Sequence, residues 1–255
     1  MFMIDKDDEK KVKALANYVK KFVTPIALTV IGPGLEDRRA IGTGTFFTDE
    51  TDKFLVSNYH VYENNYRNRL TGGYEPNKKM LLSCKVIAKN RPLDVALDCC
   101  DNLNGCPIPC LPLNLFQSVF DPVEGEFLYG IGFPASMTDL NSNQPVFPFA
   151  VLTDEWCPEE NEADYKGTHF RMRVNGLTNS FGDMSGFSGT LIWDTRIKKE
   201  GTNWTPEKAV LAGIVCKGGV DELDCTRVEC MCVSNLINYW RNNKMDIAPN
   251  TLKMF

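Results

Sequence analysis

The segment Gly186-Phe187-Ser188-Gly189 leads directly into Thr190-Leu191-Ile192-Trp193, an apolar run with the composition of a buried strand. A serine hydroxyl is a weak nucleophile until a base removes its proton and hydrogen-bond donors stabilise the oxyanion that results. Glycines on both sides of Ser188 allow the backbone to turn sharply and to point its amides at a substrate carbonyl. These four residues alone are weak evidence, so their interpretation depends on a base and an acid elsewhere in the chain.

A candidate base lies upstream, where His60 follows the run 53–59. Apolar and other residues alternate along this run, which predicts a strand that ends near His60. A histidine just past the end of a strand is held firmly and can still face a cleft. His169, the second of the chain's two histidines, lies in the alternating segment 168–173, where a structural role is favoured.

The best candidate for the acid is Asp94, in the apolar segment 92–97, and Asp98 is its nearest rival. Burying an aspartate is costly unless a neighbour donates a hydrogen bond to it. The ring N–H of a histidine is a suitable donor. Such a pair would also hold the histidine in one tautomer and one orientation.

With His60, Asp94 and Ser188 in this order, the chain resembles the trypsin/chymotrypsin-like serine proteases, in particular the bacterial trypsin-like peptidases of the PA clan. The resemblance extends over about residues 41–240. It includes five ordered segments, at 42–47, 55–61, 94–97, 125–134 and 212–218. It implies an all-β fold of two antiparallel six-stranded β-barrels, with an N-terminal and a C-terminal helix. The active site would then lie in the crevice between the barrels.

The resemblance also implies a role for each residue of the site. Ser188 would attack the scissile carbonyl, His60 would accept and later return the proton, and Asp94 would orient His60. The amides of Gly186 and Ser188 would form the oxyanion hole. A peptide substrate would pair with the segment Val215, Cys216, Lys217 and Gly218. If His169 has a functional role, it would line the specificity pocket and favour glutamate or glutamine.

Three positions near the nucleophile refine this interpretation. Ser185 is also followed by glycine, but Ser188 has Gly186 two residues before it, where the family needs an oxyanion donor, so we favour Ser188. Phe187 stands where family members activated by an N-terminal cut carry an aspartate, so we expect no such activation. Gly182 replaces the aspartate of trypsin-like specificity, which argues against strict cleavage after arginine or lysine.

The composition is that of an ordinary soluble globular protein, with 255 residues, 43% hydrophobic and 24% charged, and a net charge of −5. The acidic balance and the lack of a basic stripe argue against a nucleic-acid partner. Residues 6–21 are too charged for a signal peptide, and no run approaches the roughly 20 apolar residues that a membrane span needs. We therefore expect a cytoplasmic protein that does not bind membranes.

The chain contains ten cysteines, at positions 84, 99, 100, 106, 110, 157, 216, 225, 230 and 232. In a reducing cytoplasm we expect free thiols that pack as small apolar groups. Zinc ligation and one or more disulfides are alternatives, although the clusters lack the paired C-x-x-C spacing of structural zinc sites. We expect no metal and no cofactor.

Apolar spacing divides the chain into four parts: an N-terminal helical extension (1–24), a first barrel (25–113), a second barrel (114–232) and a C-terminal helix and tail (233–255). Helices are predicted over 7–22 and 233–242. Strands are predicted at 26–31, 42–47, 53–58, 79–88, 93–99, 126–131, 146–152, 168–174, 190–193 and 210–216.

Together these features predict a serine endopeptidase that hydrolyses peptide bonds through an acyl-enzyme intermediate. The alternative is a catalytically silent trypsin-like fold that acts as a protein-binding module. A third hypothesis is an effector protease that a regulatory protein controls through the N-terminal helix. A serine-reactive probe would separate an enzyme from a binding module.

Overall fold

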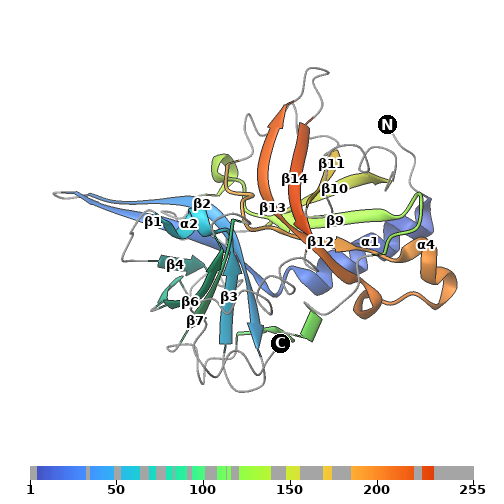
Figure 1. Ribbon diagram of the computed structural model, residues 1–255, viewed down its shortest axis with the longest axis horizontal. Helices are drawn as coiled ribbons and strands as arrows, with labels where there is room; N and C mark the ends of the chain where they lie inside the picture. Colours follow the sequence, from blue (N-terminus) through green and yellow to red (C-terminus); the bar gives the residue numbers. More distant parts are fainter. Residues whose placement is uncertain are drawn as a thin grey trace.

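Two β-sheets and a helix packed against them make up the described part of the protein (Figure 1). The computed structural model describes residues 5–32, 35–48, 53–63, 69–72, 79–82, 84–90, 94–100, 108–112, 114–115, 121–138, 148–155, 169–173, 185–220 and 226–232. Within these ranges the protein is mostly β, with few helices.

Helix α1 (Lys6–Val19) begins at a capped N-terminus. The Asp5 carboxylate accepts a hydrogen bond from the Asp7 amide at 2.8 Å, and further acidic side chains occupy the first turn, where the helix dipole favours negative charge. Its apolar buried residues recur at helical spacing: Val12, Leu15 and Val19. The helix predicted over 7–22 is present, and it ends three residues earlier than predicted.

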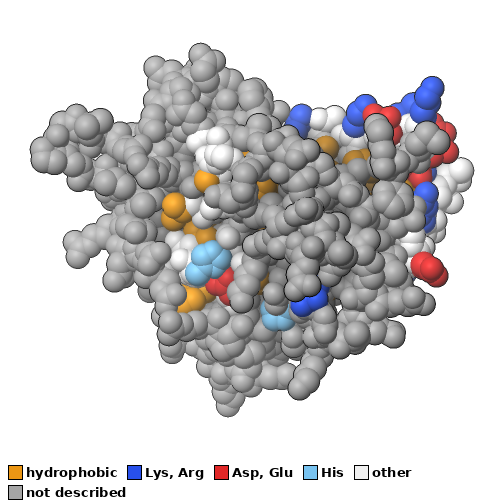
Figure 2. Space-filling view, turned by 90° about the horizontal axis from the view of Figure 1, so that it is seen from above, with side chains coloured by type: hydrophobic (Ala, Val, Ile, Leu, Met, Phe, Trp, Pro, Cys, Tyr) orange, Lys and Arg blue, Asp and Glu red, His pale blue; other side chains and the backbone are white. Residues whose placement is uncertain are grey.

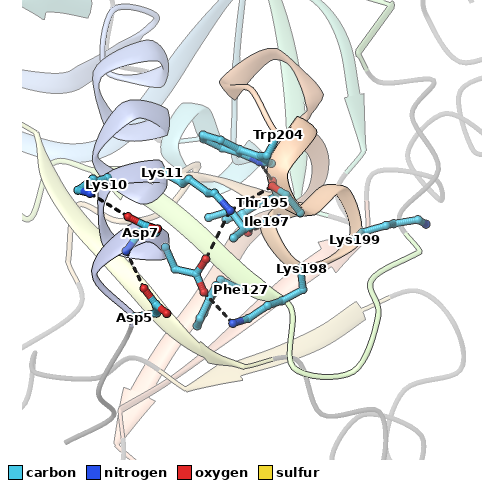
Figure 3. Close-up of polar contacts among 12 residues, drawn as sticks. Asp5, Asp7, Lys10, Lys11, Phe127, Thr195, Ile197, Lys198, Lys199 and Trp204 are labelled. Atoms are coloured by element: carbon cyan, nitrogen blue, oxygen red, sulfur yellow. Dashed lines mark hydrogen bonds and ion pairs between the residues drawn. The ribbon is translucent and has the colours of Figure 1, made fainter.

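Charged contacts fasten α1 to the short helix α4 (Ile197–Glu200) (Figure 3). Lys198 forms an ion pair with Asp8 at 2.7 Å, and Lys11 donates a hydrogen bond to the carbonyl of Gly201 at 3.1 Å. The apolar face of α1 packs into a core that contains side chains from strands of both sheets. The apolar face of this predicted extension is therefore covered by the protein itself.

The first sheet is built from residues 23–112, in the strand order β5-β4-β1-β2-β3-β7-β6, with β8 pairing parallel to β2. It has eight strands among the described residues, where we predicted six. Its strands are β1 (Val23–Gly32), β2 (Leu35–Thr48), β3 (Lys53–Ser57), β4 (Arg69–Gly72), β5 (Lys79–Leu82), β6 (Cys84–Asn90), β7 (Val95–Cys100) and β8 (Leu111–Pro112). The single strand predicted at 79–88 is divided between β5 and β6, which pair with different neighbours.

The second sheet is built from residues 127–232, in the order β10-β9-β12-β13-β14-β11, and all its pairs are antiparallel. Its strands are β9 (Phe127–Gly132), β10 (Phe149–Glu155), β11 (His169–Arg173), β12 (Leu191–Asp194), β13 (Val210–Val220) and β14 (Thr226–Cys232). Strand β14 was not predicted, although Val228, Cys230 and Cys232 alternate with Arg227, Glu229 and Met231 along it. It pairs with both β11 and β13 and so joins them.

Short helices connect these strands. They are α2 (Tyr59–Glu63), α4, and the 3₁₀ turns η3 (Ala135–Met137), η4 (Gly201–Asn203) and η5 (Pro206–Lys208). The helix predicted over 233–242 lies outside the described residues. Among the helices of the described ranges, none has the length and apolar character that crossing a membrane requires.

Candidate active site

His60 and Asp94 lie next to the paired ends of two neighbouring strands, β3 and β7. Strand β3 ends at Ser57 and β7 begins after Asp94, and the two strands are antiparallel with Ser57 opposite Ala96. The end of one strand and the start of the other therefore lie side by side. His60, in α2, directs ring atom Nδ1 at Asp94 Oδ2 across 2.6 Å, and its backbone N–H donates to Asp94 Oδ1 at 2.9 Å.

This double contact fixes the orientation of the imidazole. One carboxylate holds both the backbone and the ring of the same residue, and because a carboxylate only accepts, Nδ1 is the donor, which makes Nε2 the acceptor when the ring is neutral. The His60 side chain is 44% exposed and that of Asp94 24%, so the ring remains open to a reactant. Asp98, the rival acid, lies within β7 opposite Leu55, and the contacts to His60 come from Asp94.

Ser188 lies half-buried in the turn 185–189, immediately before β12. Two glycines of this turn have positive φ angles, +90° at Gly186 and +87° at Gly189. A Cβ at Gly186 would collide with the backbone carbonyl of Phe133, so the turn requires glycine for space as well as for conformation. The glycine signal in the sequence therefore corresponds to a real constraint on the backbone around Ser188.

Thr43, on β2 of the first sheet, holds this turn in place. Its backbone N–H donates to the carbonyl of Ser188 at 2.7 Å, and its hydroxyl donates to the carbonyl of Gly186 at 2.8 Å. The same hydroxyl accepts a hydrogen bond from the Phe133 amide at 3.0 Å. Our sequence reasoning missed this role, for which the one available signal is a small polar residue between two glycines at 42–44.

The turn that carries Ser188 lies against the segment that carries His60. A Cβ added to Gly42 would stand 2.8 Å from the side chain of Val61 and 3.1 Å from the carbonyl oxygen of Ser188. The Ser188 hydroxyl makes no hydrogen bond to the His60 ring among the contacts of the described residues. Hydrogen bonds of this kind are often long in ligand-free enzymes and tighten when substrate binds.

The amides of Gly186 and Ser188 have no acceptor in the part of the chain that the structure describes. The Gly186 N–H shares its peptide with the Ser185 carbonyl, which accepts from the Ala135 amide at 2.7 Å, and the Ser188 N–H shares its peptide with the Phe187 carbonyl, which accepts from the Thr190 amide at 2.9 Å. Neither peptide can therefore rotate freely. A pair of fixed, unengaged amides next to a serine hydroxyl can bind a negatively charged oxygen.

The segment predicted to bind substrate lies on β13, whose first part pairs with β12 up to Ile214. On the same edge of β13, Val215 forms two backbone hydrogen bonds with the segment before β12. The Gly189 amide donates to the Val215 carbonyl at 3.0 Å, and the Val215 amide donates to the Thr190 carbonyl at 2.9 Å. From Cys216 to Val220 the strand continues beside β14, and among the described strands none pairs with its other edge. An extended peptide could add to this edge.

His169 is the first residue of β11, opposite Met231 of β14, and its side chain is half-buried. Figure 2 shows both histidines of the chain, in pale blue, on one face of the molecule, with a red carboxylate beside one of them. His169 has at least one polar or electrostatic contact of its own. The predicted position of His169 at the specificity pocket stays a prediction.

Three cysteines have described side chains, and all three are free thiols: Cys110, Cys216 and Cys230. Burial raises the pKa of the Cys110 thiol, so this group stays protonated at neutral pH. Within the described part of the chain, no group of three metal-binding side chains comes together. The two groups of cysteines close in sequence, at 99–110 and 225–232, fall largely outside the described side chains.

No protein-family model matches the sequence, and a search of curated proteins finds no match. Solved structures do match. The protease domain of MamO from Magnetospirillum magneticum, in its apo form, has a TM-score of 0.53 and 9% identity, covering 87% of this chain and 96% of its own. The Rv3671c protease from M. tuberculosis, in its active form, has a TM-score of 0.51 and 13% identity, covering 92% and 86%.

A serine endoprotease from Yersinia pestis has a TM-score of 0.53 and 12% identity, and the match covers 91% of this chain but 65% of that one. All three structures are those of proteases, and the matches extend over about nine-tenths of this chain. The chain therefore has the fold of the trypsin-like serine proteases, as the sequence motifs predicted. At 9–13% identity the likeness establishes the fold alone.

Proposed function

We propose that the protein is a serine endopeptidase whose catalytic triad is His60, Asp94 and Ser188. Ser188 Oγ attacks the scissile carbonyl while His60 Nε2 takes its proton. The tetrahedral intermediate then expels the amine, which leaves with that proton, and an acyl-enzyme remains. Water next gives a proton to His60 and attacks the ester, and the proton returns to Ser188 as the acid product departs.

The observation that carries this proposal is the double contact between Asp94 and His60. A surface histidine has no need for a carboxylate that binds its backbone N–H at 2.9 Å and its ring at 2.6 Å. This arrangement serves a ring that must keep one tautomer and stabilise a positive charge during reaction. The acid, Asp94, also lies in the segment 94–97, in which the sequence motifs predicted it.

Two further features support the serine as the nucleophile. The turn around Ser188 is fixed to the first sheet through Thr43, so the serine has a defined place relative to the His60 segment. The amides of Gly186 and Ser188, which have no acceptor among the described residues, would supply the donors that an oxyanion needs. In a related system, loss of one such donor costs about 3–4 kcal/mol of transition-state stabilisation.

The protease fold implies a peptide or protein substrate, and the edge of β13 suggests how it binds. Val215, Cys216, Lys217 and Gly218 would pair with an extended peptide, which places a scissile bond near the turn 185–189. We extend the proposal to the architecture, in which each sheet closes into a barrel and the site lies between them. An experimental structure with open sheets would contradict this arrangement.

A serine-reactive fluorophosphonate probe and casein hydrolysis test the proposal together. Ser188→Ala should lose probe labelling and reduce kcat by at least about 10⁴-fold, because the nucleophile is gone, while circular dichroism and the melting temperature stay those of the wild type. Ser185→Ala is the matched control and should keep both activities. Equal activity in Ser188→Ala would refute the assignment, and loss in Ser185→Ala alone would move the nucleophile by three residues.

One observation favours the alternative, a silent fold that acts as a binding module. The Ser188 hydroxyl does not hydrogen-bond the His60 ring among the described contacts, so the site is not fully assembled as it stands. The same probe decides between the two functions. A wild-type protein that never reacts with the fluorophosphonate, even with a peptide bound, would be a binding module.

Control by a regulatory protein through α1 would involve the outer face of that helix. The inner face is packed, and the outer face carries exposed ion pairs of Lys10 with Asp7 and of Lys13 with Glu9. Reversing the charge of Lys10 and Lys13 should then abolish capture of such a protein without changing casein hydrolysis. Capture that is insensitive to these charges would place the partner elsewhere.

A further inference from the structure

Asn58 is a buried polar side chain that the proposed mechanism leaves without a role. It follows β3, precedes His60 by two residues, and is fully buried. Its amide nitrogen donates a hydrogen bond to the backbone carbonyl of Asp94 at 2.7 Å and also reaches the Sγ of Cys216 at 3.8 Å. Burying an amide is costly unless hydrogen bonds compensate, and these two contacts compensate the nitrogen alone, because the buried Oδ1 has no hydrogen-bond partner among the described residues.

Asp94 has a backbone conformation that needs such support. Its φ angle is +54°, in the left-handed region, where a residue other than glycine carries a conformational cost of about 1 kcal/mol. The carbonyl that Asn58 holds belongs to this same residue. The carboxylate of Asp94 therefore faces His60 from a backbone that another side chain keeps in place.

We infer that Asn58 is a positioning residue, which fixes the left-handed backbone of Asp94 and thereby aims its carboxylate at the His60 ring. The effect on turnover rests on the proposed function, whereas the effect on the His60–Asp94 contact does not. Among the described contacts, Asn58 touches neither the reacting atoms nor the imidazole, so it acts through Asp94.

The second contact of Asn58 extends this role to the other sheet. Cys216 is buried on β13, and its thiol donates to the carbonyl of Ile214 at 3.5 Å. One amide group therefore connects the Asp94 segment of the first sheet to the strand proposed to bind peptide. Cys216→Ala should consequently show a weaker form of the Asn58→Ala effect, because it removes the weaker of the two contacts.

The test compares Asn58→Ala with Thr195→Val. Thr195 is also fully buried, and its hydroxyl donates a buried hydrogen bond to Glu126 at 2.9 Å, away from His60 and Asp94. Asn58→Ala loses the hydrogen bond to Asp94 and the weaker contact to Cys216, while Thr195→Val loses the bond to Glu126 and a weaker one from the Ile197 amide at 3.4 Å, so a general loss of stability affects them alike. The two readouts are kcat and KM for a peptide substrate, and the low-field proton resonance of the His60 Nδ1–H, which reports the bond to Asp94.

In Asn58→Ala we expect kcat to fall about 10- to 100-fold with KM within about twofold, since a displaced general base affects the reaction more than substrate binding. We also expect the Nδ1–H resonance to broaden or disappear. Thr195→Val should keep the wild-type kcat and the Nδ1–H resonance. The inference is overturned if Asn58→Ala retains the resonance and kcat, or if Thr195→Val loses them equally.

If the wild-type protein neither hydrolyses peptides nor reacts with the probe, the proposed function fails, and the Nδ1–H resonance alone decides the role of Asn58. If Asn58→Ala does not fold, the wild type supplies a second measurement. The side-chain amide protons of Asn58 should exchange with solvent far more slowly than those of Asn17, which is exposed on α1. Equal exchange rates would overturn the inference.

Discussion

Two carboxylates in this protein, Glu126 and Asp94, are held in contrasting ways. Glu126 is fully buried and accepts hydrogen bonds from groups that cannot change their charge: the amides of Phe127, Lys198 and Lys199 and the hydroxyl of Thr195. Asp94 is partly exposed and faces an imidazole, which can gain or lose a proton.

The contrast separates a carboxylate held by fixed donors from one that, in the proposed function, takes part in the reaction. The fixed donors around Glu126 satisfy the hydrogen-bonding capacity of its oxygens and join β9 to α4. The imidazole beside Asp94 is 44% exposed and so remains able to exchange a proton with a reactant. A substitution at Asp94 should therefore change activity, and one at Glu126 should change stability.

The largest effect is expected for Asp94→Asn, which keeps the shape of the side chain but favours the wrong tautomer of His60. We expect kcat for peptide hydrolysis to fall about 10⁴-fold, with the unfolding free energy changed by less than about 1 kcal/mol. Steady-state kinetics and urea unfolding measure the two quantities. Asp98→Asn tests the rival acid on the same segment and should keep wild-type kcat, and a larger loss there would reassign the acid.

Glu126→Gln should have an intermediate effect of the opposite kind. In the variant, the side-chain NH₂ group of glutamine would replace an oxygen that accepts from backbone N–H groups, and those groups would lose their acceptor. We therefore expect a loss of about 2–3 kcal/mol in the unfolding free energy. The kcat of the folded variant should stay within about twofold of the wild type. Glu124→Gln, on an exposed neighbour, is the control for urea unfolding. A selective loss of kcat in Glu126→Gln would contradict the contrast.

A smaller, pH-dependent effect is expected at Asp194, a fully buried carboxyl whose Oδ2 lacks a hydrogen-bond partner among the described residues. Burial raises its pKa from 3.8 to about 6, and the nearby Glu126 adds to this, while the Arg196 amide opposes it. Between these values the folded state binds more protons than the unfolded state, so this carboxyl costs stability as the pH rises from 4 to 7.

Asp194→Asn removes that titration and can still accept from the Arg196 amide. Relative to the wild type, the variant should gain about 2 kcal/mol of unfolding free energy between pH 4 and pH 7. Urea unfolding at both pH values measures the difference, which cancels the titration of the other groups. A wild-type to variant difference that is constant with pH would show that Asp194 is not protonated in the folded protein.

Much of the site could be predicted because its residues lie in short segments with local signals. Gly186 has a positive φ, which favours glycine and therefore leaves a signal in the sequence beside Ser188. Asp94 stands among apolar residues, where an aspartate needs a hydrogen-bond donor, and His60 follows an alternating run that marks the end of a strand. Most predicted strands also lie within a few residues of those in the structure, because alternation follows directly from the pleat of a half-buried strand.

Other features depend on partners that are distant in the chain. Strand β4, Arg69–Gly72, has no alternating pattern of its own and is placed by pairing with β1 and β5. Thr43 and Asn58 are ordinary polar residues in the sequence, and their roles come from carbonyl groups at Gly186, Ser188 and Asp94, between 36 and 145 positions away.

The sequence by itself determined the chemical types and the order of the candidate residues, the places where the backbone must turn, and the alternating runs that become strands. These follow from the properties of each residue and its near neighbours. The tertiary structure alone decided that the Asp94 carboxylate meets the His60 ring and that Thr43 clamps the serine turn. It decided this because such contacts depend on the packing of segments that are close in space and far apart in the chain.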